Sequence, residues 1–310
     1  MLRQTRVRFT ADDRDRLAKA SSARARLKGE GTLSKVNQVV LITGASSGIG
    51  EALAREYVKQ GAHVALLARR SGRLASLCQE LNQGGVKRAI AITADVTKDG
   101  DVEAAMARTL AELGPVHTVV ANAGGGRLGH FTELTLEDFR EQVELNVYGV
   151  IRTVYACLAS LQQTRGSVVI VSSVMAYLPL PSAAPYNMSK AAARSLAESL
   201  RVDLSGLGIN VTHVAPGFIN TELRRVGSDG RKNLDAKDPV PLWMQMPAPV
   251  AARKIIRATR RRRGELVLTG HGKLGVFVGR HFSWLTSVVL AFVARRSMRA
   301  RPARAPVSPS

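Results

Sequence analysis

The sequence predicts an α/β fold: a single domain in which a doubly wound parallel sheet of about seven strands carries helices on both faces. From Gln38 onward, short apolar runs alternate with longer amphipathic segments, as parallel strands alternate with crossover helices. The short runs are rich in Val, Ile, Leu and Ala and have few polar positions, which is typical of strands buried on both faces. The 45% hydrophobic content suits a globular core.

The elements follow from these two patterns. The expected strands are Val39–Ile42, His63–Leu67, Arg88–Ile92, Val116–Ala121, Ser167–Val171, Ile209–Val214 and Glu265–Leu268. The expected helices are Gly48–Gln60, Arg73–Leu81, Asp101–Leu113, Leu136–Ala159, Ala184–Leu204 and Pro249–Arg262. One long irregular stretch, residues 218–246, is rich in Gly, Pro and charge and is expected to be a lid or a disordered loop.

The net charge of +21 is concentrated at the two ends of the chain. Residues 1–38 carry ten Lys/Arg against four Asp/Glu, and residues 251–310 carry fourteen against one. We therefore expect a nearly neutral folded body with a basic N-terminal extension, residues 1–37, and a basic C-terminal tail, residues 271–310. These ends could contact anionic lipid, nucleic acid or an acidic partner, or they could be solvated tails without a partner.

The composition also bears on compartment and metal content. Cys78 and Cys157 are far apart and lie in predicted helices, so neither a disulfide framework nor a thiolate metal site is expected. The six histidines show no ligand spacing with acids or cysteines, so we expect no metal. Residues 1–31 contain no apolar stretch and hence no signal peptide, which favours a cytoplasmic protein.

The first predicted strand runs directly into a glycine-rich turn, Thr43-Gly44-Ala45-Ser46-Ser47-Gly48-Ile49-Gly50, and a helix follows. Glycine permits a tight turn and close backbone approach, while a helix N-terminus directs N–H groups and a positive dipole at an anion. This turn predicts a site for the phosphates of a nucleotide. Its spacing, Gly-x3-Gly-x-Gly, differs from the G-x-G-x-x-G of the common dinucleotide fingerprint.

The end of the second strand, Ala68-Arg69-Arg70, bears on which nucleotide is bound. An acidic residue would normally hold the ribose 2′-hydroxyl in an NAD site, and none is present here. The guanidinium of Arg69 could instead pair with a 2′-phosphate, so NADP(H) is favoured over NAD(H). The alternative is that Arg69 lies at a solvated strand end.

Tyr186 and Lys190 are four residues apart at the start of a predicted helix, which places them on one face. An ammonium beside a phenol would stabilise the phenolate and lower its pKa, making Tyr186 a usable acid or base. Taken singly, such a pair is usually surface packing. Together with the glycine turn it indicates catalysis.

The chain resembles the short-chain dehydrogenases/reductases over residues 38–270. The ordered motifs that carry the resemblance are Thr43–Gly50, Asn122-Ala123-Gly124, Asn146, Ser173, Tyr186 with Lys190, and Pro216-Gly217. The resemblance implies a Rossmann-like fold, a homo-oligomer and a hydride transfer between nicotinamide and a carbonyl or secondary alcohol. It makes Tyr186 the acid or base, Lys190 a ligand of the nicotinamide ribose, and Ser173 a hydrogen-bonding partner of the reacting oxygen.

The same resemblance assigns further residues. Ser173 is preferred to Ser172 because it precedes Tyr186 by the family's usual thirteen residues. Asn146 would hold a water that links the Lys to solvent. The expected cofactor contacts are Gly44, Ser46, Ser47, Gly48, Ile49, Gly50, Arg69, Asp95, Val96, Asn122, Ala123, Gly124, Tyr186, Lys190, Pro216, Gly217, Ile219 and Thr221.

The predicted lid and the C-terminal tail resemble the short-chain dehydrogenases/reductases less than the segments that carry these motifs do. Within residues 218–246, Phe218 and Trp243 could cover a lipophilic substrate beside Ser173 and Tyr186, or they could anchor the lid to the body. The apolar run Phe282–Ala294 is too short to cross a bilayer, and arginines follow it, as in a helix that lies on a membrane surface. A helix packed on the body or on a second subunit is the alternative.

Two functions therefore compete. The first is an NADP(H)-dependent carbonyl reductase or alcohol dehydrogenase acting on a small-molecule substrate. The second is a non-catalytic nucleotide-binding protein that docks on membrane or nucleic acid through its basic ends. The complete set of Asn146, Ser173, Tyr186 and Lys190 favours the enzyme and makes nucleic acid the less expected partner.

Overall fold

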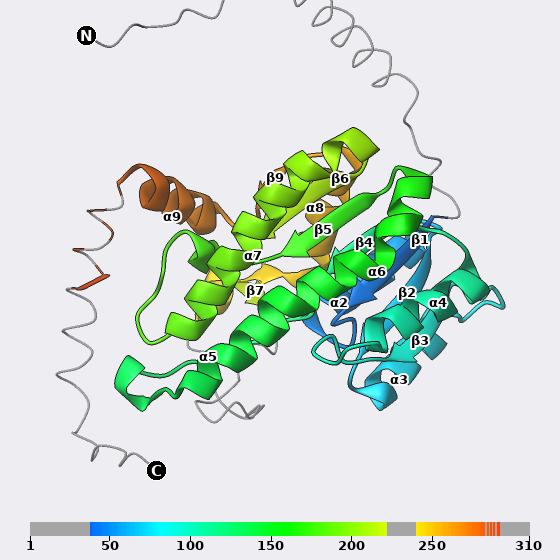
Figure 1. Cartoon of the computed structure of the whole chain (residues 1–310), viewed down its shortest axis with the longest axis horizontal. Helices are drawn as coiled ribbons and strands as arrows, with labels where there is room; N and C mark the ends of the chain where they lie inside the picture. Colours follow the sequence, from blue (N-terminus) through cyan, green and yellow to red (C-terminus); the bar gives the residue numbers. More distant parts are fainter. Residues whose placement is uncertain are drawn as a thin grey trace, which may run out of the picture. The chain divides into compact units, whose positions relative to one another are not determined.

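The computed structural model describes residues 38–221 and 240–282, together with residues 284, 286, 288, 290 and 291. The predicted extension 1–37, the middle of the predicted lid and the last part of the predicted tail lie outside these residues. Seven parallel strands form one sheet in the order β3-β2-β1-β4-β5-β6-β9 (Figure 1). The order runs outward from β1 in one direction and from β4 in the other, which confirms the doubly wound, Rossmann-like α/β fold.

The strands of this sheet agree with the predicted runs to within one residue at each end. They are β1 (Val39–Thr43), β2 (His63–Ala68), β3 (Ala89–Thr93), β4 (Val116–Ala121), β5 (Ser167–Val171), β6 (Asn210–Ala215) and β9 (Glu265–Val267). The α-helices are α2 (Gly48–Lys59), α3 (Ser71–Leu81), α4 (Asp101–Leu113), α5 (Leu136–Val143), α6 (Gly149–Thr164), α7 (Ala184–Asp203), α8 (Ala248–Arg260) and α9 (Gly270–His281).

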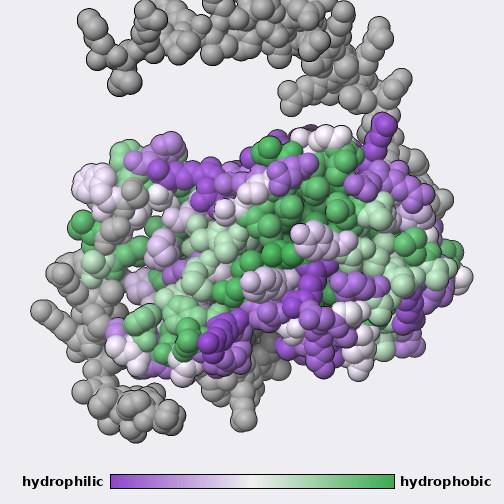
Figure 2. Space-filling view, in the orientation of Figure 1, coloured by the Kyte–Doolittle hydropathy of each residue, from purple (hydrophilic) through white to green (hydrophobic). Residues whose placement is uncertain are grey.

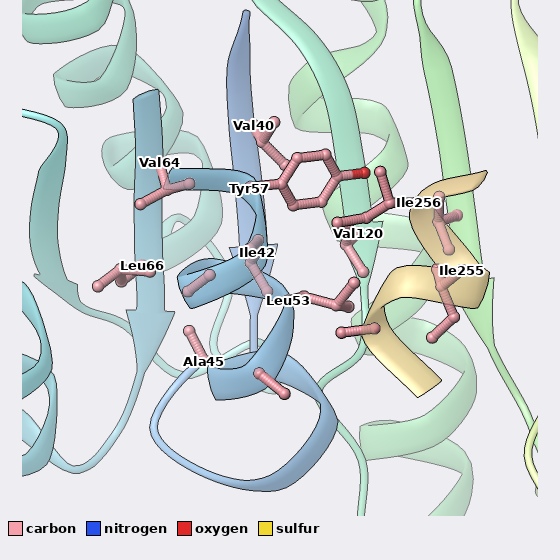
Figure 3. Packing of buried hydrophobic residues seen from close by; sticks show 14 of the residues in the cluster. Val40, Ile42, Ala45, Leu53, Tyr57, Val64, Leu66, Val120, Ile255 and Ile256 are labelled. Carbon is pink, nitrogen blue, oxygen red and sulfur yellow. The ribbon is translucent and has the colours of Figure 1, made fainter. Parts of the chain in front are cut away.

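Alternate residues of each strand face opposite sides of the sheet and build two cores. Val40 and Ile42 of β1 join α2, α3 and α8 on one side, where Tyr57 is fully surrounded (Figure 3). Val39 and Leu41 face the other side, which α4, α6 and α7 cover. Both faces are apolar because both are buried, which is the reason the strands lack polar alternation.

The predicted single helix Leu136–Ala159 is wrong in one respect. A π-helical turn at Glu144–Tyr148 divides it into α5 and α6, and α6 extends to Thr164. A π-helical turn inserts one extra residue into an otherwise α-helical backbone. The apolar pattern of the sequence did not reveal this insertion. Such turns occur often at functional sites, and this one contains Asn146.

Two features after β6 were not predicted. Short strands β7 (Ile219–Asn220) and β8 (Met246–Pro247) pair in parallel and bring the two ends of the predicted lid together. Helix α9 follows β9 and packs through Val276 against Ala176, Tyr177 and Ala215. The start of the predicted tail therefore forms a helix that packs on the body. This is the arrangement that the sequence analysis gave as the alternative to a membrane-surface helix.

Candidate active site

The glycine turn lies between the carboxyl end of β1 and the first turn of α2. Gly44 and Gly48 have φ of +66° and +61°, a conformation that side chains rarely adopt. A Cβ atom at Gly50 would come within 2.5 Å of the Gly44 carbonyl oxygen. The turn therefore leaves no room for a side chain at residue 50. The hydroxyl of the N-cap residue Ser47 does not cap α2, in contrast to Thr135, which accepts from Asp138 N at α5.

The hydroxyls of this turn instead face an arginine that the sequence analysis did not assign. The guanidinium of Arg70 donates to the Ser46 Oγ at 3.1 and 2.9 Å and to the Ser47 Oγ at 2.7 Å. Arg69, the predicted phosphate ligand, has a side chain that is 71% exposed, and it pairs with Asp95 at 3.8 Å. Two serines in the turn and two adjacent arginines were visible in the sequence, but only the fold shows which arginine meets the serines.

Asn122 ties the end of β4 to the end of β1. Its Nδ2 donates to the carbonyls of Thr43 and Gly44 at 3.0 and 3.2 Å. The backbone N–H groups of Asn122 and Ala123 both donate to the Thr43 Oγ1. Asn122 therefore connects the ends of β4 and β1 next to the glycine turn.

Asp95, Val96 and Gly149 lie at the end of β3 and the start of α6. The Asp95 Oδ1 accepts from the Thr97 N–H and hydroxyl, so this carboxylate shapes its own turn. Val96 is buried, and a Cβ at Gly149 would come within 2.7 Å of its side chain. Of these predicted cofactor contacts, Asp95 therefore pairs with Arg69 and Val96 packs against α6.

Tyr186 and Lys190 lie in the first turns of α7, on the same face, and both are buried. The Lys190 Nζ is 5.8 Å from the centroid of the Tyr186 ring and donates to the Val171 carbonyl at the end of β5 at 3.2 Å. A Cβ at Gly124 would lie 3.1 Å from this Nζ. The ends of β4 and β5 and the start of α7 therefore meet at the ammonium.

Burial shifts the pKa of both groups. Burial raises the pKa of Tyr186 above its usual value, and the nearby Ser173 hydroxyl lowers it only in part. Burial also lowers the pKa of Lys190 to about 8. Burial therefore acts on the pKa of Tyr186 in the direction opposite to the lowering that the sequence analysis expects, because desolvation penalises both charged forms.

The two candidate serines have different partners. The Ser172 hydroxyl donates to the Lys190 carbonyl at 2.9 Å and so fastens β5 to α7. The Ser173 Oγ accepts from the Met175 N–H at 3.1 Å, and the Ser173 hydroxyl lies close enough to the phenol of Tyr186 to lower its pKa. Ser173 thus contacts the candidate acid or base, and Ser172 supports the backbone behind it.

Asn146 is fully buried and joins three segments of the site. Its amide exchanges two 3.1 Å hydrogen bonds with the backbone of Gly125. Its Nδ2 also donates to the Ser189 Oγ at 2.9 Å, and that hydroxyl donates to the Tyr186 carbonyl. Ser189 was not singled out from the sequence, because a serine between Tyr186 and Lys190 has no distinguishing pattern.

The remaining predicted residues follow β6. The Pro216 carbonyl accepts from the Val174 N–H, and Gly217 packs so closely on Thr269 that no side chain fits. Ile219 is buried, and Thr221 packs against Gly48. These contacts bring this turn next to the glycine turn.

The two predicted substrate residues outside the tyrosine and serine lie in different surroundings. The ring of Phe218 stacks on His271 of α9, with centroids 5.2 Å apart. Trp243 lies on a 3-10 helix, Leu242–Met244, and is 84% exposed. The structure therefore brings Phe218 against the body and leaves Trp243 at the surface.

The donor set fits a dinucleotide. Uncapped N–H groups at the start of α2 and the guanidinium of Arg70 face the glycine turn, which is the chemistry that phosphates require. Tyr186 and Lys190 lie at the carboxyl ends of the central strands, where ligands of open α/β sheets bind.

Comparison with protein families matches residues 38–232 to the family described as short chain dehydrogenase. The chain belongs to this family. A protein of Pinus massoniana named 11-beta-hydroxysteroid dehydrogenase is 35% identical over 189 residues, which cover 61% of this chain and 53% of that protein. The chain thus spans about half the length of that relative.

Solved structures of the family share the fold over nearly their whole length. An alcohol dehydrogenase of Thermococcus sibiricus, complexed with 5-hydroxy-NADP, is 30% identical with a TM-score of 0.64, covering 75% of this chain and 96% of that one. A 3-ketoacyl-(acyl-carrier-protein) reductase of Brucella melitensis, complexed with NADH, is 26% identical with a TM-score of 0.67, covering 76% and 98%. Family members similar to this short-chain dehydrogenase thus bind either nicotinamide cofactor.

Proposed function

We propose that this chain is an NADP(H)-dependent oxidoreductase that transfers a hydride between nicotinamide and a carbonyl or secondary alcohol carbon, with Tyr186 as acid or base. The observation that carries the proposal is the convergence of a buried phenol, a serine hydroxyl close to it and a buried ammonium, on a fold whose glycine turn suits phosphates. A bound nicotinamide supplies or accepts the hydride. The protein groups supply the proton and hold the reacting oxygen.

In the direction of reduction, Tyr186 donates its hydroxyl proton to the substrate oxygen. The raised pKa keeps the phenol protonated, which is the state that a donor needs. Ser173 shares its hydroxyl with the same oxygen and stabilises the charge that develops there, an effect worth a few kcal/mol. Lys190 lies on the same helical face, with its Nζ close to Gly124.

Asn146 is a positioning residue in this scheme. Its amide holds Gly125 and, through Ser189, the carbonyl of Tyr186. Asn146 lies in the π-helical turn and is buried, so its side chain connects the loop after β4 to helix α7, which carries Tyr186. A water held by its main chain would complete a proton path from Lys190 to solvent.

The preference for NADP(H) rests on two arginines. Arg70 is held against the serines of the glycine turn, and the Arg69 side chain beside it is 71% exposed and pairs with Asp95 at 3.8 Å. Adjacent guanidinium groups suit a dianion. Among the described residues next to the end of β2, the Asp95 carboxylate pairs with Arg69. It is therefore not free to accept a hydrogen bond from a ribose 2′-hydroxyl.

Two apolar residues at the ends of the predicted lid and the named relatives support a lipophilic substrate. Met246 of β8, at the end of the predicted lid, packs on the core, and Phe218 at its start stacks on His271. Proteins named 11-beta-hydroxysteroid dehydrogenase are among the relatives. A lipophilic carbonyl or alcohol of steroid-like bulk is therefore the first class to test.

The test is a panel of lipophilic and small carbonyls and alcohols, each assayed with NADPH, NADH and their oxidised forms. We expect turnover with NADPH, and we expect Tyr186→Phe to retain cofactor affinity while losing almost all turnover. Undiminished turnover by Tyr186→Phe would remove this residue as the acid or base. Absence of turnover across the panel, with nucleotide binding intact, would favour the non-catalytic alternative.

The predicted homo-oligomer stays a prediction. Figure 2 shows apolar residues gathered near the centre of this face. Tyr155 of α6 and Val202 of α7 are 71% and 70% exposed. Sedimentation equilibrium of the whole chain measures the assembly directly.

A further inference from the structure

Helix α9 packs on the body through Val276 and several glycines, and it leaves two of its largest apolar side chains exposed. Gly272, Gly275 and Gly279 face the segment Val174–Leu178, and a Cβ at Gly279 would come within 2.7 Å of the Tyr177 carbonyl oxygen. The large residues Leu274 and Phe277 point outward and are 65% and 54% exposed. An ordinary surface helix has the opposite arrangement, with large apolar residues inside.

This outward face is held firmly. Arg280 of α9 donates to the two carboxylate oxygens of Glu265 in β9 at 2.9 and 3.1 Å, and its guanidinium lies 4.7 Å from the ring centroid of Tyr177. The Thr269 hydroxyl caps the first turn by accepting from Gly272 N at 3.1 Å. The exposure of Leu274 and Phe277 is therefore a feature of the folded structure and not of a frayed end.

The apolar surface continues past α9. Phe282, Trp284 and Val288 are 43%, 68% and 61% exposed, and the last two are four residues apart, on one helical face. We name the five exposed residues Leu274, Phe277, Phe282, Trp284 and Val288 the C-terminal apolar row. No helix among the described residues is long and apolar enough to cross a membrane.

The charge of the sequence that contains and follows this row indicates what covers it. From Leu266 to Ser310 the sequence has seven Lys/Arg and no Asp/Glu. Lys273 stands exposed beside Leu274, Arg280 is paired with Glu265, and the other five lie outside the described residues. A second copy would bring the same positive charge to the same surface, which like-charge repulsion disfavours. An anionic bilayer offers an apolar interior for the row and negative headgroups for the cations.

We propose that the C-terminal apolar row, with the lysine and arginines that flank it, docks on the surface of an anionic phospholipid bilayer. The row enters the boundary between headgroups and acyl chains, and the basic side chains pair with lipid phosphates and carboxylates. Docking does not require the proposed hydride transfer, so its test is independent of activity.

The experiment is vesicle flotation of the full chain with phosphatidylcholine alone and with about 30% phosphatidylserine added, at low salt and at about 0.5 M salt. We expect flotation only with the anionic vesicles, weakened by salt. The double variant Leu274→Ser/Phe277→Ser removes two exposed apolar side chains and should reduce bound protein at least about tenfold. Both side chains are exposed, so the melting temperature should stay unchanged.

The matched control is Val86→Ser/Leu110→Ser. These residues are 52% and 43% exposed and lie near β3, the opposite edge of the sheet from β9. The control should float like the unchanged protein. Equal flotation of the Leu274/Phe277 variant, or flotation independent of phosphatidylserine, overturns the proposal. The proposal is also overturned if the unchanged protein never floats but self-associates or binds RNA, and the Leu274/Phe277 variant abolishes that interaction.

Discussion

The ammonium of Lys190 lies 5.8 Å from the ring centroid of Tyr186 and is buried to 5% exposure, with the Val171 carbonyl as a hydrogen-bond acceptor. A charge in such a position is costly, and its pKa of about 8 expresses that cost. The protein therefore keeps a destabilising group at the point where the proposed chemistry needs one.

Lys190→Met should raise the free energy of unfolding at pH 7 while reducing turnover. Lysine is charged in the unfolded chain up to pH 10.5, whereas folding lowers its pKa to about 8, so the penalty is full below pH 8 and shrinks above it. After the lost bond to Val171 is subtracted, we expect a gain of about 2 kcal/mol at pH 7 that falls to near zero by pH 9.5. Urea unfolding of the protein without cofactor at the two pH values measures it, and a pH-independent difference would contradict the argument.

Ser173→Ala and Ser172→Ala should separate catalysis from stability. Ser173 lies close to the Tyr186 phenol, so its loss should lower kcat by about 100-fold with little change in Tm. Ser172 holds the Lys190 carbonyl, so its loss should cost about 1 kcal/mol of stability and leave most of kcat. Steady-state kinetics and thermal unfolding of both variants decide the assignment, and reversed effects would exchange the two roles.

Arg70→Ala should weaken NADPH binding more than Arg69→Ala does. Arg70 is already ordered by Ser46 and Ser47, so little side-chain entropy is lost when it binds a phosphate. A charge-assisted bond of about 1.5 to 3 kcal/mol corresponds to roughly a 10- to 100-fold rise in Kd. Titration of protein fluorescence with NADPH and NADH measures both, with Arg108→Ala on α4 as the control. Equal losses for the two nucleotides would remove the 2′-phosphate from the explanation.

Gly50→Ala should lose both stability and nucleotide binding. The new methyl group would meet the Gly44 carbonyl oxygen at 2.5 Å and the Asn122 Nδ2 at 2.7 Å, and opening the turn should cost about 1 to 3 kcal/mol. Gly72→Ala in α3 is the matched control, because nothing lies within 4 Å of its added Cβ, and it should stabilise by about 0.5 to 1 kcal/mol. Denaturant unfolding compares the two, and tolerance of alanine at residue 50 would mean that the turn is looser than its contacts indicate.

The sequence by itself determined the sheet and the main polar residues of the site. The seven strands could be predicted because a strand buried on both faces must be apolar at successive positions, as Val39–Ile42 is. The pairing of Tyr186 with Lys190 was also local, since a four-residue spacing on a helix places two side chains on one face.

The tertiary structure decided what depends on neighbours distant in the chain. Only the packing of β2 against β1 brings Arg70 to Ser46 and Ser47, and only burial shows that the pKa of Tyr186 is raised rather than lowered. The π turn at Asn146 and the outward apolar face of α9 likewise depend on which side of each helix meets the body. Periodicity reports local geometry, whereas desolvation and partner choice are properties of the packed whole.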